Sequence, residues 1–169
     1  MSLSLYEVTV PALLRGLAVL STYLDKAAAF AADNTIDPSV LVNARLAPDM
    51  QSLAGQVQRA SDTAKLAVPR LTGIAAPSFP DTETTFEQLH ERINNTVAFL
   101  KTVTEDQFAD AETRAVELKF RTQAVTLTGT AYALTFLLPN LYFHVTTAHD
   151  ILRHNGVKIG KLDYLGVAS

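Results

Sequence analysis

The stretch TTFEQLHERINNTVAFLKTV, residues 84–103, carries the strongest structural signal in the chain. Its apolar residues recur every three or four positions, which is the repeat of one face of an α-helix. These residues are Phe86, Leu89, Ile93, Val97, Leu100 and Val103. Thr84 and Glu87 have the spacing of a capping box, in which two side chains satisfy backbone N–H groups at a helix start. The stretch therefore predicts a helix that begins at this box and buries one face.

Three further segments show the same repeat and are predicted to be helices. They are residues 10–32, 48–68 and 131–155. The first is expected to place Pro11 in its first turn, where the missing N–H of proline costs nothing. Asp37 and Pro38 read as an N-cap and a first-turn proline, which predicts a short helix through Val42. Pro139 predicts either a kink in the last helix or two abutting helices, because proline removes a hydrogen bond and collides with the preceding turn.

Between the third and fourth predicted helices, the apolar repeat changes to every second residue. The apolar members are Val116, Leu118, Phe120, Val125 and Leu127. This alternation is typical of a half-buried pair of strands, with a turn near Arg121. The sequence therefore predicts an all-α fold, a four-helix bundle with a small β-hairpin between helices 3 and 4. Its 169 residues suit a single domain, residues 1–169.

Composition excludes several classes of function. The net charge is −3 and the basic residues are scattered, which argues against a nucleic-acid-binding surface. The absence of cysteine excludes disulfides, thiolate metal sites and cysteine nucleophiles, and it fits a reducing compartment. The first residues contain Glu7 and no basic leader, so they do not read as a signal peptide. Residues 131–143, the most apolar run, are shorter than the roughly 20 residues of a membrane span. We expect a cytoplasmic protein that binds neither nucleic acid nor membrane.

Four histidines are the obvious candidates for chemistry, and three of them lie in the last predicted helix. At about 100° per residue, His144 falls beside the apolar stripe and is expected to face the inside of the bundle or its rim. Asp150 and His154 fall on the outside, where an i, i+4 pair could meet. His144 is then either a core-flanking histidine with one hydrogen bond, or a metal ligand or acid–base group in a pocket. The residues predicted to line that pocket are His144, Gln56, Ser61 and Asn155.

The remaining histidine, His90, follows Glu87 at the spacing found in one half of a di-iron carboxylate site. Such a site needs two of these motifs, and the sequence has no second Glu-x-x-His. The sequence also has no G-x-S-x-G motif and no glycine-rich phosphate loop. Motifs alone therefore assign no class of enzyme.

Three segments resemble a known family: ARLAPDMQSLAGQVQRASDTAK (44–65), FPDTETTFEQLHERI (79–93) and LPNLYFHVTTAHDILRHNGVKIGKLDYLG (138–166). They are similar to a bacterial domain-of-unknown-function family, numbered nineteen ninety-three, within the DinB/YfiT-like superfamily. The resemblance covers nearly the whole chain. It implies a four-helix bundle of that superfamily's type, often found as a homodimer. Several relatives are metal-dependent, and some act as thiol transferases or isomerases.

The resemblance also implies where a metal would bind. The superfamily's site takes one histidine from helix 2 and two from helix 4, commonly as His-x-x-x-His. Here Gln56 is the polar residue nearest the helix 2 place, and helix 4 has no His-x-x-x-His. His144 and His154 are about 15 Å apart along a helix, which is too far for one ion. His144, Asp150 and His154 therefore remain weak candidates for a divalent metal, which would be zinc, nickel or iron.

Two functions stay open. We prefer a small-ligand-binding or interaction module with a degenerate metal site, and the small residues of helix 2 could support a homodimer. The alternative is a metal-dependent enzyme of the DinB-like transferase or hydrolase type, with His144 as its base or sole histidine ligand. The missing second histidine favours the first function.

Overall fold

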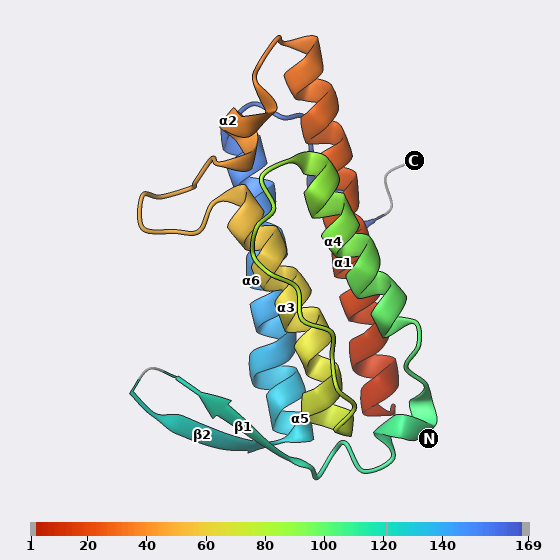
Figure 1. Cartoon of the computed structure of the whole chain (residues 1–169). Coiled ribbons are helices and arrows are strands. Elements are labelled where there is room, and N and C mark those ends of the chain that lie inside the picture. The colour runs from red at the N-terminus through yellow and green to blue at the C-terminus, as the bar shows by residue number, and fades with distance from the viewer. Residues whose placement is uncertain (1–2, 121, 167–169) are drawn as a thin grey trace.

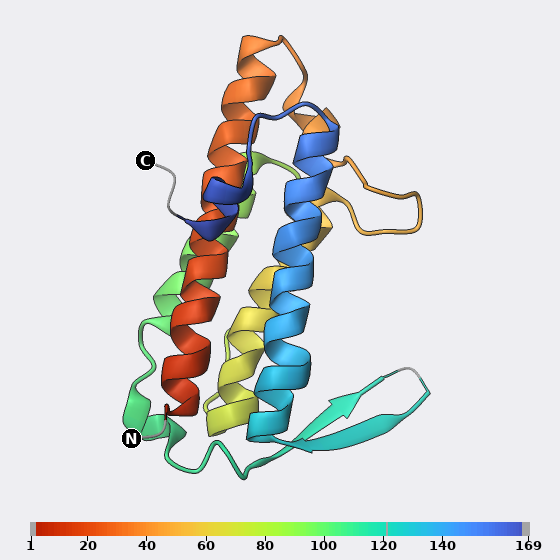
Figure 2. The same cartoon turned by 180° about the vertical axis from the view of Figure 1, so that it is seen from behind.

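Four longer helices, α1, α3, α4 and α6, lie alongside one another and form the body of the protein (Figures 1 and 2). The structure is a computed structural model and describes residues 3–120 and 122–166. In chain order the elements are α1 (Leu5–Asp33), α2 (Pro38–Val42), α3 (Leu53–Thr72), α4 (Phe86–Leu100), the 3-10 turn η1 (Glu105–Phe108), β1 (Ala115–Lys119), β2 (Ala124–Thr128), α5 (Gly129–Tyr132), the π-helical turn η2 (Ala133–Leu137), α6 (Leu138–His154) and α7 (Lys161–Leu165). The described chain is mostly helical with a small antiparallel hairpin, as the sequence predicted.

The helix α1 begins before the predicted start because Ser4 and Glu7 form a capping box. The Ser4 hydroxyl accepts the N–H of Glu7, and the Glu7 carboxylate accepts the N–H of Ser4. Pro11 therefore lies inside the helix, and the prediction that it occupies the first turn was wrong. The predicted apolar stripe is buried, namely Leu13, Leu17, Leu20 and Leu24.

Among the described helices, α1 alone is long and apolar enough to cross a membrane by those two criteria. Core helices of bundles meet the same criteria. In its most apolar window 44% of the residues are buried, and the helix packs against α4 and α6. Packing inside this chain thus buries part of the apolar length of α1.

The helix α3 begins at Leu53 rather than near Pro48, because Ser52 is the residue that caps it. It ends at Thr72, where Gly73 adopts a left-handed conformation with φ 83°. Small residues on its inner faces are buried, and they include Ala54, Gly55, Ala60, Ala64 and Ala67. Since α1, α4 and α6 all contact α3, this small-residue surface is packed within the chain.

The helix α4 starts one residue later than the capping box in the sequence suggested. Thr85, and not Thr84, is the N-cap, and its hydroxyl accepts the N–H of Gln88. The Gln88 side chain in turn accepts the N–H of Thr84. Glu87 consequently lies exposed on the surface. The apolar repeat predicted the helix. It did not predict which of the two adjacent threonines would be the N-cap, because that depends on the conformation of the preceding loop.

The predicted hairpin is present and extends away from one end of the helical body (Figures 1 and 2). Its antiparallel register runs from Ala115 opposite Thr128 to Lys119 opposite Ala124. The buried positions include Val116 and Leu118 on β1, whereas Phe120 is 46% exposed. Phe120 lies past the end of β1, and its ring packs edge-to-face against that of Phe136 in η2, with centroids 6.1 Å apart. The predicted turn residue Arg121 lies outside the described residues.

The elements α5, η2 and α6 follow one another without a loop. The irregularity predicted at Pro139 is a change of helix type next to that residue. The wide π-helical turn η2 directly precedes Pro139. A π turn changes the backbone spacing where proline cannot bond the carbonyl four residues back, which relieves the clash without ending the helix. After α6, Gly156 adopts φ 95°, and α7 folds back onto α1, where Lys26 pairs with Asp163 at 2.5 Å.

Candidate functional site

His144 and Gln56 meet where α6 packs against α3. The Nδ1 atom of His144 lies 2.8 Å from Oε1 of Gln56. Gln56 is only 1% exposed, whereas His144 is half-buried at the edge of the two helices. Helical geometry predicted that His144 faces inward or toward the rim, and the structure places it at that rim.

The direction of this hydrogen bond follows from the other contact of Gln56. The Gln56 amide nitrogen donates to the backbone carbonyl of Gln51 at 3.2 Å. A carbonyl only accepts hydrogen bonds, so the amide oxygen of Gln56 must face His144. The Nδ1 atom of His144 therefore carries the proton, and a neutral ring leaves Nε2 as an acceptor. Among the described residues, none donates a hydrogen bond to Nε2.

The ring of His144 stays neutral at physiological pH. Burial, and secondly the positive charge of Arg59, lower the pKa of His144 from 6.5 to about 4. A base with such a low pKa takes up a proton poorly at pH 7. The arrangement therefore favours a fixed hydrogen-bond acceptor over a general base.

His144 lies beside an exposed aromatic ring and near a second polar contact between α6 and α3. Phe143 is 55% exposed, and its ring stands edge-on to the His144 ring with centroids 5.4 Å apart. One turn earlier on α6, the Asn140 side chain donates to the hydroxyl of Thr63 on α3 at 2.7 Å. Polar contacts on two successive turns hold α6 in register with α3.

The other two predicted pocket residues lie elsewhere. Ser61 is fully buried, and its hydroxyl is 2.8 Å from that of Thr96 on α4. Asn155 follows the last residue of α6, and its side chain donates to the carbonyl of Ile151 at 2.7 Å. The structure thus brings together His144 and Gln56, and it separates Ser61 and Asn155 from them.

The residues around His144 do not fit the divalent metal that the superfamily's pattern implies. One turn after His144 stands Ala148, which is buried and has no donor atom. Asp150 bonds its neighbour His149 at 3.1 Å and not His154, which is exposed. No group of three or more histidine, cysteine, aspartate or glutamate residues within residues 3–120 and 122–166 could hold a metal ion.

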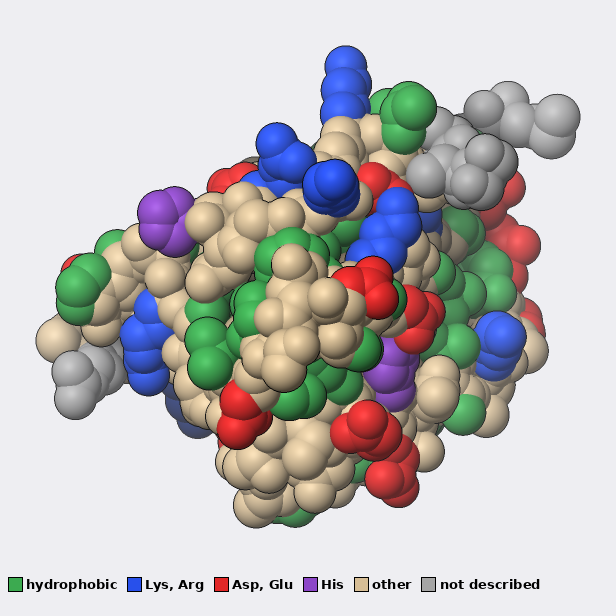
Figure 3. Space-filling model, turned by 90° about the horizontal axis from the view of Figure 1, so that it is seen from above, with side chains coloured by type: hydrophobic (Ala, Val, Ile, Leu, Met, Phe, Trp, Pro, Cys, Tyr) green, Lys and Arg blue, Asp and Glu red, His purple; other side chains and the backbone are tan. Residues whose placement is uncertain are grey.

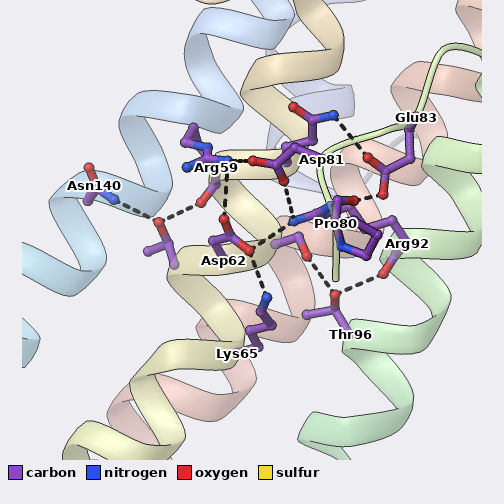
Figure 4. Close-up of polar contacts among 12 residues, drawn as sticks. Arg59, Asp62, Lys65, Pro80, Asp81, Glu83, Arg92, Thr96 and Asn140 are labelled. Atoms are coloured by element: carbon purple, nitrogen blue, oxygen red, sulfur yellow. Dashed lines mark hydrogen bonds and ion pairs between the residues drawn. The ribbon is translucent and has the colours of Figure 1, made fainter. Parts of the chain in front are cut away.

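A charged cluster joins α3, α4 and the loop between them (Figure 4). At its centre, the Arg92 side chain is 1% exposed and lies about 3 Å from three carboxylates. The members are Arg59, Lys65 and Arg92, and Asp62, Asp81 and Glu83. Three positive charges thus face three negative ones. Arg59 belongs to this cluster and also lowers the pKa of His144, so the cluster adjoins the His144 site.

Sequence reasoning missed this cluster, although a signal was present. Asp81 and Glu83 stand in the loop just before α4, and Arg92 follows in the second turn of that helix. An arginine on the apolar side of a helix, near acidic residues of the preceding loop, indicates a buried ion pair. Periodicity alone does not show which loop residues fold back onto the helix.

The comparisons with known proteins agree with this fold. No curated protein matches the chain. A crystal structure of a DinB family member protein from Shewanella denitrificans, at 1.83 Å resolution, is 44% identical, with a TM-score of 0.89. The match covers 98% of this chain and 92% of that one. The family described as "Domain of unknown function (DUF1993)" matches residues 5–165. The chain therefore belongs to the DUF1993 family and is similar to a DinB family protein of known structure.

Proposed function

We propose that this protein is a small-ligand-binding or interaction module on a DinB-like four-helix bundle, with a degenerate metal site. The ligand would bind at the rim between α3 and α6, beside His144. The observation that carries the proposal is the Gln56 contact, which fixes the His144 ring and leaves Nε2 as an acceptor. A rigid acceptor of this kind selects ligands that carry an O–H or N–H donor.

The neighbouring side chain narrows the class of ligand. Phe143 exposes an aromatic ring at an angle to the His144 ring. A flat aromatic molecule could pack against Phe143 while its donor reaches His144, because aromatic rings prefer edge-to-face or offset contacts. We therefore propose a neutral aromatic ligand with one donor, of the phenol or indole type.

Phenol and anisole test this proposal, since the two have similar rings and only phenol has an O–H donor. We expect ligand-observed NMR to show phenol binding, with at least tenfold weaker binding of anisole. His144→Ala should abolish the preference for phenol, and the control His154→Ala, at an exposed position of the same helix, should keep it. Equal binding of both probes, or a preference that survives His144→Ala, would refute the proposal.

The second candidate function is a metal-dependent enzyme that uses His144 as its only histidine ligand. The free Nε2 atom beside Gln56, where the superfamily's pattern places a metal, is the observation that favours it. Metal analysis of the purified protein separates the two candidates. Stoichiometric zinc, nickel or iron that is lost in His144→Ala would support the enzyme and count against the ligand-binding module.

A homodimer and a cytoplasmic location stay predictions. Light scattering after size exclusion, at micromolar concentration, tests the first, and a monomer under these conditions would refute it.

A further inference from the structure

The hydroxyl of Ser21 on α1 contacts a side chain of another helix, as the hydroxyl of Ser61 on α3 also does. Most buried or half-buried hydroxyls in these helices donate to the carbonyl four residues earlier. Those that do so include Thr9, Thr63, Thr72, Thr96 and Thr147. The Ser21 hydroxyl instead lies 3.2 Å from Nδ1 of His90 on α4. The contact is therefore a link between two helices.

His90 makes a second contact that sets the direction of the first. Its Nε2 atom lies 3.1 Å from Oδ1 of Asp25, one turn after Ser21 on α1. An ionised carboxylate only accepts hydrogen bonds, so Nε2 carries the proton and donates to Asp25. In the neutral ring, Nδ1 is then an acceptor, and the Ser21 hydroxyl donates to it. Carboxylate, imidazole and hydroxyl thus stand in the order that activates a serine nucleophile.

The three side chains can be reached from outside. Ser21 and His90 are half-buried, and the Asp25 side chain is 72% exposed. A hollow of 490 Å³ begins at Ala28, two helical turns or about 10 Å along α1 after Ser21, and lies between the end of α1, the start of α2 and the start of α4. Its apolar walls include Ala28, Ala31, Ala32, Ile36, Pro38 and Phe86. Figure 3 looks onto this end of the molecule and shows hydrophobic side chains at the surface, with acidic side chains beside them.

Charge around the hollow indicates which molecules it would accept. Asp37 and Glu87 lie at its edge, and Asp25 lies between the hollow and Ser21 along α1. Negative groups on this side repel anions and tolerate neutral molecules. The apolar walls suit an aliphatic chain. The substrate class that fits is an uncharged ester with a long aliphatic acyl group, because the chain must span about 10 Å along α1 from Ser21 to the hollow.

We propose that Ser21 is a nucleophile for acyl transfer, with His90 as its general base and Asp25 as a positioning residue. The Ser21 Oγ forms a bond to the carbonyl carbon of the ester while Nδ1 of His90 takes the hydroxyl proton. The ester C–O bond then breaks, and the leaving alcohol takes that proton from His90. Water attacks the acyl-serine, gives its proton to His90, and the acid leaves as the proton returns to Oγ.

A fluorophosphonate with a long alkyl chain tests the nucleophile directly. Oγ of an activated serine bonds to phosphorus as fluoride leaves, and the adduct is located by mass spectrometry. We expect labelling at Ser21, with a rate about 10²-fold lower in His90→Gln, as general-base catalysis implies. Hydrolysis of p-nitrophenyl decanoate should fall in parallel. The control Ser39→Ala, at an exposed serine of α2, should leave both rates unchanged.

The competing explanation is that Ser21, His90 and Asp25 only tie α1 to α4. Melting temperatures of all variants measure that structural role separately. Asp25→Asn should slow labelling, and Asp25→Glu should restore part of the rate, which a merely structural contact would not do. Both substitutions change an exposed side chain, so folding should survive if His90→Gln does not fold. Failure to label Ser21 in the unmodified protein, or equal labelling in Asp25→Asn, would overturn the proposal.

Discussion

Replacing Arg92 by methionine tests how strongly the charged cluster holds α4 to α3 and to the preceding loop. The Arg92 guanidinium contacts Asp62 at 2.9 Å, Asp81 at 3.0 Å and Glu83 at 2.9 Å. It also donates to the carbonyl of Pro80 at 3.1 Å. Removing it leaves three carboxylates facing only the two remaining cations. The substitution should therefore destabilise the fold through uncompensated charge and release the loop.

The magnitude follows from how buried the partners are. Removing one partner of a fully buried ion pair costs about 3–5 kcal/mol. The Arg92 side chain is 1% exposed, but those of Asp62, Asp81 and Glu83 are 21%, 42% and 12% exposed. Water will solvate part of the uncompensated charge, so we expect the lower end, about 3 kcal/mol. Burial raises the pKa of Glu83, but hydrogen bonds from Arg92 and Gln58 lower it overall. In Arg92→Met that pKa should rise.

Urea denaturation followed by circular dichroism measures the free energy of unfolding for Arg92→Met at pH 7. The matched control is Arg153→Met on α6, because Arg153 is exposed and should cost less than about 0.5 kcal/mol. Arg92→Lys should fall between the two, since lysine keeps the charge but not the fork of donors. If Arg92→Met lowers the free energy of unfolding by less than about 1 kcal/mol, the reasoning is refuted. Such a small loss would mean that the carboxylates are not left uncompensated when the arginine is removed.

Three further predictions concern single positions. The pKa of His144 is about 4 in the fold and 6.5 when unfolded, so the unfolded chain alone takes up the proton as pH falls from 6.5 to 4. The free energy of unfolding should therefore fall over that range, by about 3.4 kcal/mol for the whole pKa shift and by about 2 kcal/mol after allowing for solvent at the half-buried ring. Urea denaturation at pH 7 and pH 4.5 measures this loss, which should be smaller in His144→Leu. An equal loss in the two proteins would contradict the shift. Gly129→Ala would place a Cβ 1.7 Å from the Ala111 carbonyl oxygen and should cost about 3 kcal/mol or more of stability. The control is Gly160→Ala, whose Cβ would meet no atom within 4 Å. Equal melting temperatures of the two variants would be inconsistent with this close approach. Ser4→Ala removes the cap of α1 and should cost about 1 kcal/mol, and an unchanged melting curve would show that the helix start is held by other contacts.

Local sequence patterns predicted much of the fold because they depend on neighbours along the chain. The repeat from Phe86 to Val103 identified α4, and alternation from Val116 onward identified the hairpin. The starts of helices were less well predicted. Ser4, Ser52 and Thr85 each compete with a nearby residue of similar capping strength, and the winner depends on how the preceding loop packs.

The candidate site could be predicted only in part, for the same reason. Helical geometry placed His144 toward the inside of the bundle or its rim, because the direction of a side chain on one helix needs no knowledge of the others. It gave no means of pairing residues between helices. Ser61 faces Thr96, and His90 bridges Ser21 and Asp25, because of how α1, α3 and α4 are rotated against each other. Contacts between distant segments set that rotation.

The state of the His144 ring tests the ligand-binding account most directly. Long-range ¹H–¹⁵N NMR spectra of the imidazole identify which nitrogen carries the proton and follow it with pH. The account predicts a proton on Nδ1 and a bare Nε2 at pH 7, with the ring staying neutral until the pH approaches 4. A proton on Nε2 at pH 7, or a ring that becomes charged near pH 6.5, would contradict it.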